Sequence, residues 1–264
     1  MPEGDTIHRA AATLRARLGG KKILRWSSPL PQLARASLVG RTIVKVEAFG
    51  KNLFMILDDG RSIHSHMRMK GSWHVYPPSE RRRALSPTAR ATIEVEDCVA
   101  ICFSAPVVRV LSGAEAARAV EALGPDLLAA DFDLGAATER LLAQGARPIG
   151  EVVMDQEVIA GIGNIYKSEC LYVARINPFV SAWSLGKDKT RELLALARRL
   201  MQRNLSPGTP MRTTRIGGSS RVWVYKRSGD HCFTCGAKIR MKRQGAMNRS
   251  TYYCPSCQNV EGET

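Results

Sequence analysis

The sequence has no run of apolar residues long enough to cross a membrane. A spanning helix needs about 18 or more such residues in succession, and the 264-residue chain contains no such stretch. Its first residues are polar and charged, so we expect no secretory signal. No internal repeat is visible, which argues against a solenoid or propeller. These absences predict a cytoplasmic protein with no membrane partner.

A disulfide framework is not expected either, because the chain is long and lacks a secretory segment. It nevertheless contains seven cysteines, and four of them form two Cys-x-x-Cys pairs separated by 18 residues. This spacing is typical of a two-hairpin zinc ribbon. We therefore predict one structural Zn²⁺ bound by Cys232, Cys235, Cys254 and Cys257. The remaining cysteines have apolar neighbours and are expected to be buried: Cys98, Cys102 and Cys170.

Acidic residues are scarce in the part of the chain that holds these pairs. Between Arg212 and Arg249 there are ten Lys or Arg residues and one acid, Asp230. The whole chain has 39 Lys and Arg against 24 Asp and Glu, a net charge of +15. Aromatic residues such as Trp223 and Tyr225 are interleaved with the basic ones. A basic, aromatic segment with a zinc ribbon is typical of a protein that binds nucleic acid.

The first three residues, Met1-Pro2-Glu3, predict a nucleophile. If Met1 is removed, Pro2 carries a terminal amine, and such amines titrate near pH ~8 whereas lysine titrates near ~10.4. More of it is therefore neutral and nucleophilic at physiological pH. A secondary amine that attacks a sugar C1′ gives a positively charged iminium, which acts as an electron sink. The alternative is that Pro2 has no chemical role, as in many chains that start Met-Pro.

Hydrophobic periodicity divides the chain into a strand-rich part and a helical part. Up to about residue 112, short alternating segments joined by turns predict a β-sandwich or barrel. Apolar residues at helical spacing predict a helix over Asp5–Leu18. The predicted strands are 42–49, 52–57, 62–66, 72–76, 91–96 and 99–103, and the predicted later helices are 134–144, 149–156, 164–174 and 187–205.

Two of those helices are joined by a glycine turn. Gly161 and Gly163 precede Asn164, which we expect to cap a helix whose free N–H groups bind phosphate. A plain corner between two helices would also explain the glycines.

Taken together, these motifs resemble the formamidopyrimidine-DNA glycosylase/endonuclease VIII family of base-excision repair. The resemblance extends from Pro2 to Gln258 and implies an α+β, multi-domain fold. It implies an N-terminal β-sandwich domain with an N-terminal helix over 1–112, a helix–two-turns–helix domain over 113–228 and a zinc ribbon over 229–264. The motifs that carry it are Met1-Pro2-Glu3-Gly4, Gly50-Lys51-Asn52-Leu53-Phe54, Gly161-Ile162-Gly163-Asn164-Ile165-Tyr166-Lys167-Ser168-Glu169 and Arg249-Ser250-Thr251-Tyr252-Tyr253-Cys254-Pro255.

The resemblance implies a catalytic role for three residues. Pro2 would displace the damaged base and form the iminium, and Glu3 would protonate the sugar ring oxygen as the ring opens. Lys51 would hold the phosphate beside the lesion, although a lysine in a turn is ordinarily a solvated charge. Thr6 stands where many relatives have a second glutamate, so part of the usual acid–base pair is missing.

Other residues are implied to bind the distorted DNA. Asn164 and Arg249 would bind its backbone, and Met69 would fill the gap that the extruded nucleotide leaves. A buried core position is the alternative for Met69. Glu169 also matches the family, with a helix-stabilising role as the alternative.

Departures from the family pattern indicate the subtype. The stretch 105–109 lacks the arginine pair and phenylalanine of 8-oxoguanine-specific members, and 212–225 is short for the lid over that base. The sequence is therefore closest to endonuclease VIII of the actinobacterial type. This predicts a monomeric, nucleoid-associated glycosylase and AP lyase that removes oxidised pyrimidines and cuts by β,δ-elimination. Damaged double-stranded DNA is the expected partner, with single-stranded DNA left open.

Two other functions remain compatible with parts of the sequence. One is a catalytically silent binder of abasic or bent DNA, and the other is a zinc-ribbon module of transcription or translation. The joint presence of Pro2, Glu3 and Lys51 argues against the first. The N-terminal motif and the glycine turn argue against the second.

Overall fold

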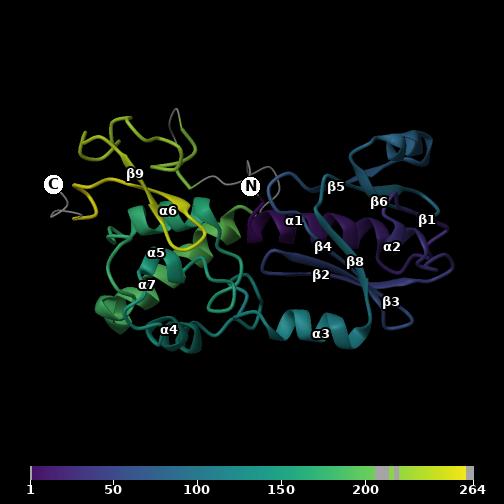
Figure 1. Cartoon of the computed structure of the whole chain (residues 1–264), viewed down its shortest axis with the longest axis horizontal. Coiled ribbons are helices and arrows are strands. Elements are labelled where there is room, and N and C mark those ends of the chain that lie inside the picture. Colours follow the sequence, from purple (N-terminus) through teal and green to yellow (C-terminus); the bar gives the residue numbers. More distant parts are fainter. Residues whose placement is uncertain (1, 206–213, 217–219, 260–264) are drawn as a thin grey trace. The chain divides into compact units, whose positions relative to one another are not determined.

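The computed structural model describes residues 2–205, 214–216 and 220–259, and Figure 1 shows the order of their helices and strands. The chain divides into two compact units, Met1–Ala122 and Leu123–Thr264. Among the described residues, no helix is both long and apolar enough to cross a membrane.

The first unit contains two four-stranded antiparallel sheets around one core. Residues from both sheets belong to a single buried apolar cluster, and Trp73 Nε1 on one sheet donates to Ser65 Oγ on the other at 2.9 Å. One sheet has the order β1-β6-β7-β5 and the other β2-β3-β4-β8. The strands are β1 Arg25–Ser27, β2 Ile43–Phe49, β3 Asn52–Leu57, β4 Ser62–His66, β5 Ser72–Tyr76, β6 Ala89–Glu94, β7 Val99–Phe103 and β8 Val107–Leu111.

Helix α1, Gly4–Leu18, confirms the helix predicted at the start of the chain. It buries one apolar face, including Ile7, Ala11 and Leu14, in the core that the two sheets share. The helix runs antiparallel to β2, because Gly20 N donates to Ile43 O at 2.8 Å at one end and Arg15 Nε to Val46 O at 2.9 Å further along. Its first residues therefore lie toward the β2–β3 turn, as the first unit in Figure 1 shows.

Sequence reasoning missed some elements of this unit. Strands β1 and β8 were not predicted, since each is short and only partly buried. A charged 3-10 helix, η1, Pro78–Leu85, was not predicted either. The short helix α2, Pro31–Ala34, and helix α3, Gly113–Glu121, complete the unit. Helix α3 begins with a capping box in which Ser112 and Glu115 bond each other's backbone.

The second unit has a helical core and a β-hairpin. Its helices are α4 Leu134–Leu142, α5 Ile149–Val152, α6 Asn164–Val173, η2 Trp183–Leu185 and α7 Gly186–Arg203, and its strands β9 Arg240–Gln244 and β10 Arg249–Tyr253 pair antiparallel.

Helix α6 is buried over most of its length. The helix predicted over 149–156 ends instead at Val152, after which the backbone bonds span three residues, from Met154 N to Glu151 O and from Asp155 N to Val152 O.

Candidate functional site

Pro2 and Glu3 lie at the N-terminal end of α1. Pro2 is half-buried, and Glu3 has none of its surface exposed. Glu3 is the N-cap residue, with extended backbone (φ −121°, ψ −177°), yet its side chain makes no capping hydrogen bond. The Glu3 carboxylate is therefore buried next to Pro2 and does not cap the start of α1. Met1, on whose removal the predicted amine depends, lies outside the described residues.

Lys51 lies in the two-residue turn between β2 and β3. Phe49 pairs with Asn52, so Gly50 and Lys51 alone form the turn. Gly50 has φ +57°, the positive value that glycine supplies at the first position of a type II′ hairpin. Asn52 then fixes the turn, because its Nδ2 donates to Phe49 O at 3.4 Å. The sheet therefore presents the lysine at a defined point, on the side where α1 begins.

His66 is a neighbour of Lys51 that the sequence reasoning overlooked. It ends β4 and pairs with Asn52 across the sheet. Burial lowers its pKa to about 4, with the charges of Arg68 and Lys51 acting in the same direction. Its Nδ1 accepts from Arg68 N at 3.1 Å, which leaves the proton of the neutral ring on Nε2. The imidazole is therefore a neutral hydrogen-bond donor close to the lysine ammonium.

The loop after β4 separates two methionines. Met67 is 2% exposed and belongs to the core, whereas Met69 is 68% exposed. Gly71 closes the loop where no side chain fits, because a Cβ there would lie 2.6 Å from Met67 O. Met69 is thus a surface residue on a tightly packed loop, and a core position does not explain it.

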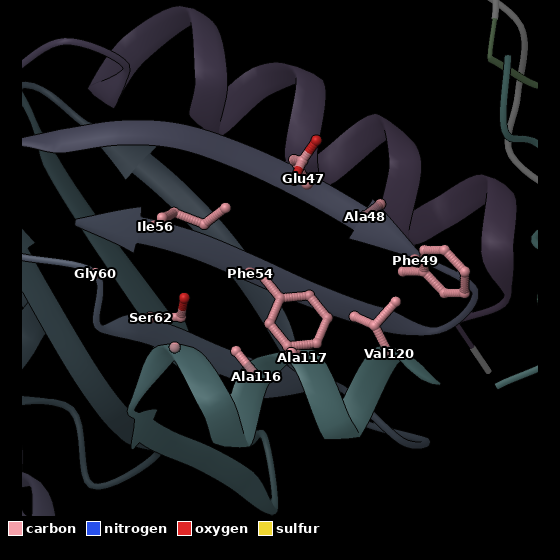
Figure 2. Close-up of a pocket in the computed structure, with 11 residues that line it drawn as sticks. Glu47, Ala48, Phe49, Phe54, Ile56, Gly60, Ser62, Ala116, Ala117 and Val120 are labelled. Carbon is pink, nitrogen blue, oxygen red and sulfur yellow. The ribbon is translucent and has the colours of Figure 1, made fainter. Parts of the chain in front are cut away.

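A cavity of about 400 Å³ lies on the outer face of the β2–β3–β4 sheet, beneath α3. Figure 2 shows Phe49 and Phe54 from the sheet and Val120 from α3 lining it. None of the described residues that line it is basic. The cavity is therefore unsuited to a phosphate, but it lies directly behind the strand ends that hold the Lys51 turn.

In the second unit, Asn164 does not cap α6 as predicted. Gly163 is the N-cap (φ −120°, ψ −162°) and Asn164 is the first helical residue, without a capping bond. Gly161, at φ +113°, makes the tight turn that leads there. Asn164 is 7% exposed, and its Oδ1 has no partner among the described residues. An amide can turn to present either its oxygen or its nitrogen to a ligand.

Arg249 lies at the first position of β10, just after the hairpin turn. Its Nε is also buried without a partner among the described residues. Buried polar atoms are almost always hydrogen-bonded, so each exception requires an explanation. Two of the five side-chain atoms of this kind in the described chain belong to Asn164 and Arg249. Arg249 Nε can donate a hydrogen bond to an incoming acceptor, and the Asn164 amide can do so through Nδ2 once it turns.

The four paired cysteines converge at one site. Their sulfur atoms all lie within 4.8 Å of one another, and Cys232–Cys257 and Cys235–Cys254 are 3.8 and 3.4 Å apart. A tetrahedral site with Zn–S bonds of about 2.3 Å has sulfur–sulfur edges of roughly 3.8 Å, so the group fits zinc. Backbone N–H groups of Thr234 and Cys257 point at sulfurs, each at 3.4 Å. The site can hold a metal of this kind.

Glu169 is a buried acid of the second unit with four hydrogen-bond donors. It has no exposed surface and accepts from the backbone N–H groups of Trp223, Val224 and Tyr225 at 2.7 to 2.9 Å, as well as from Thr214 Oγ1. Burial raises the pKa of its carboxyl, and the four donors oppose that rise. Its partners lie in another segment, so it stabilises the approach to the ribbon rather than α6 alone.

Known protein families account for this arrangement. The formamidopyrimidine-DNA glycosylase N-terminal domain matches residues 1–106, and the formamidopyrimidine-DNA glycosylase H2TH domain matches residues 123–215. The chain therefore belongs to the formamidopyrimidine-DNA glycosylase family. The protein is therefore a DNA glycosylase with AP lyase activity that acts in base-excision repair.

Within this family the chain is similar to endonuclease 8 proteins of actinobacteria. It is 38% identical to the probable endonuclease 8 2 of Streptomyces coelicolor, over 98% of this chain and 94% of that protein. It is 36% identical to the DNA-(apurinic or apyrimidinic site) lyase Nei2 of Mycolicibacterium smegmatis, over 98% and 100%.

A solved structure of Lactococcus lactis formamidopyrimidine-DNA glycosylase has the same fold. It was determined with the protein bound non-covalently to DNA containing an AP site. It matches with a TM-score of 0.80 at 24% identity, over 97% of this chain and 99% of that one.

Proposed function

We propose that this protein excises oxidised pyrimidines from DNA with Pro2 as nucleophile and then cuts the strand at the resulting abasic site. The observation that carries the proposal is the position of Glu3. A carboxylate with no exposed surface lies beside the N-terminal proline, and helix capping does not account for it. A buried acid next to an amine is the pair that glycosidic cleavage through an iminium requires.

The reaction follows from these two groups. The Pro2 nitrogen attacks C1′ and the bond between C1′ and the base breaks. The base departs with the electron pair and takes up the proton that the Pro2 nitrogen loses. Glu3 gives a proton to the ring oxygen, and the C1′–O4′ bond opens to leave a Pro2 iminium at C1′. Loss of a proton from C2′ expels the 3′ phosphate, and a second elimination expels the 5′ phosphate. Water then releases Pro2.

The Lys51 turn is proposed to hold the phosphate beside the lesion. Lys51 supplies a positive charge, and neutral His66 supplies an Nε2–H donor close to it. A rigid turn at the end of the sheet that α1 also approaches places both groups near the reacting sugar. Charged contacts to phosphate make binding depend on salt concentration.

The second unit is proposed to bind the distorted backbone through Asn164 and Arg249: Arg249 Nε–H donates to a phosphate oxygen, and the Asn164 amide turns so that its Nδ2–H₂ does the same. Met69 enters the stack where the damaged nucleotide has left it. Zinc, when bound by the four cysteines, fixes the hairpin that carries Arg249 and has no chemical role. Within this scheme 1–112 is the catalytic part, 113–228 the helical DNA-binding part and 229–264 the ribbon, in a monomer acting on the nucleoid.

The proposed lesion class depends on strand β8. Val107 and Val108 occupy the stretch where 8-oxoguanine-specific relatives carry polar reading groups, and Val108 is 3% exposed in the core. Neither valine can donate a hydrogen bond to a cytosine opposite the lesion. Oxidised pyrimidines are therefore the favoured substrates.

The test compares duplexes that contain thymine glycol, dihydrouracil, 8-oxoguanine opposite cytosine, or an abasic site. We expect excision of both pyrimidine lesions to exceed that of 8-oxoguanine, and abasic DNA to give fragments with phosphate on both ends. Glu3→Gln should lose about a hundredfold or more in base excision, whereas Glu121→Gln, an exposed acid on α3, should not change it. Tight binding of abasic DNA without any cutting would instead support the silent binder.

A further inference from the structure

Lys167 is a buried lysine to which the proposed chemistry gives no role. It lies on α6, one turn after Asn164, and only 1% of its surface is exposed. Its Nζ donates to Thr251 Oγ1 at 2.8 Å and to Ser250 O at 3.2 Å. Both acceptors belong to β10, and Ser250 directly follows Arg249. One side chain thus joins the helix that begins at Asn164 to the strand that begins at Arg249.

The contact belongs to a chain of buried hydrogen bonds that fixes the hairpin. Thr251 Oγ1 accepts from Lys167 and donates to Gln244 Oε1 at 2.8 Å, and Gln244 Nε2 donates to Pro178 O at 2.9 Å. Lys167, Thr251 and Gln244 are all buried. Gly150 leaves room for this chain, because a Cβ there would lie 2.5 Å from Gln244 Oε1. A buried network in which each member has partners holds one geometry.

A neighbouring residue of α6 contributes in the same way. Ser168 Oγ donates to Asn164 O at 3.1 Å and accepts from Tyr252 N at 3.3 Å. Lys167 thus binds the β10 backbone at Ser250, and Ser168 binds it two residues further along, at Tyr252. Of these two helix residues, Lys167 bonds the position next to Arg249, through Ser250 O.

We propose that Lys167 is a positioning residue for Arg249, which sets the spacing between the two backbone-binding groups Asn164 and Arg249. This inference depends on the proposed DNA-backbone role of that pair. Without the Lys167 bonds, β10 loses the restraint next to Arg249, and the guanidinium no longer meets the phosphate in a single arrangement. Lys167 itself is too deeply buried to touch DNA.

The test is a double-mutant cycle on binding of a duplex that contains a tetrahydrofuran abasic analogue, which cannot react. Lys167→Met keeps the length of the side chain and removes its amino group. We expect Lys167→Met and Arg249→Ala each to weaken binding about tenfold, and the double variant to bind no more than about twofold weaker than Arg249→Ala alone. The control Lys187→Met removes an exposed lysine of α7 and should leave binding nearly unchanged.

Salt dependence separates positioning from general loss of structure. Arg249→Ala should lower the slope of log affinity against log salt by about one, and Lys167→Met should lower it by nearly as much although it touches no phosphate. Zinc content and the unfolding transition show that each variant is folded. If Lys167→Met does not fold, Thr251→Val removes the acceptor at nearly constant volume and enters the same cycle.

Different results would contradict the positioning role of Lys167 and the proposed function of the protein. Wild-type binding of Lys167→Met, or losses that simply multiply in the double variant, would overturn the positioning role. A wild-type protein that binds the abasic analogue no more tightly than undamaged DNA would instead overturn the proposed function itself.

Discussion

His64 Nε2 lies 2.9 Å from Asn52 Oδ1, so that a buried histidine holds the residue next to Lys51. Because the Asn52 oxygen can only accept, Nε2 carries a proton, and the lowered pKa of His64 leaves Nδ1 without one at neutral pH. The ring also stacks on Phe54, with centroids 4.7 Å apart. The Lys51 turn is therefore braced by a side chain whose second proton would place a charge on the buried Nδ1, an atom with no partner among the described residues.

This relationship predicts a loss of stability in acid. Burial, together with the Arg109 charge, lowers the His64 pKa from 6.5 to about 4, and His66 shows the same shift through burial and its cationic neighbours. Between these values the unfolded chain binds more protons than the folded one, so stability falls as pH drops from about 6.5 to 4. Urea unfolding across this window measures it, and His64→Gln should flatten the profile. A profile unchanged by His64→Gln would contradict the assignment.

A second prediction tests whether Lys51 and His66 are neighbours in solution. The Lys51 charge disfavours protonation of His66, so Lys51→Met should raise the His66 pKa above its wild-type value of about 4. The pKa should remain below 6.5, because burial is the larger cause. NMR titration of the imidazole gives both values. The control is Lys45→Met, which removes a lysine on the same sheet that is paired with Glu47. An unchanged His66 pKa would show that Lys51 does not lie close to His66 in solution.

Much of the first unit could be predicted from its sequence, because its strands are short segments rich in apolar residues and bounded by turns. The six predicted strands and α1 are present, and each contributes residues to a single core. Strand β8 was missed because it pairs only along β4 and is half-buried. Such a strand has a weak periodic signal, and its paired residues on β4 are 41 to 49 positions away in the sequence, a separation that local pattern does not reveal.

Motifs in the sequence predicted the residues of the candidate site. They did not predict the contacts between segments that are distant in the sequence. The Cys-x-x-Cys spacing was sufficient to group four cysteines, as the structure confirms. Asn164 was expected to cap α6, but Gly163 does so and leaves the amide for another partner. The partners of Lys167 and Glu169 are some 50 to 80 residues away, so no local rule could identify them.

The hydrogen bonds to Glu169 predict that a conservative substitution there lowers the free energy of unfolding substantially. Glu169→Gln replaces one acceptor oxygen by an NH₂ group that faces backbone donors, leaving at least one buried N–H unpaired. The expected loss is about 1–3 kcal/mol of unfolding free energy, measured by urea denaturation. Glu192→Gln, an exposed acid on α7, should change stability by less than about 0.5 kcal/mol. Equal effects of the two variants would show that the buried contacts do not form.

The cysteine site predicts one zinc ion per chain by elemental analysis. Cys254→Ser should lose the metal and weaken DNA binding, because the hairpin that carries Arg249 then lacks its anchor. The first unit should remain folded, since its core contains none of these residues. Amide hydrogen exchange of α1 and the strands of the first unit follows that unit separately. Carefully purified protein without stoichiometric zinc would contradict the ribbon.

The central claim is that Pro2 is the nucleophile, and borohydride trapping tests it most directly. Incubation with abasic DNA and borohydride should reduce the iminium to a stable amine and leave a covalent adduct. Digestion and mass spectrometry of that adduct should place the modification on Pro2 at the N-terminus of a chain that has lost Met1. Pro2→Gly should lose most of the adduct. An adduct mapped to a lysine, or full activity in protein that retains Met1, would contradict the claim.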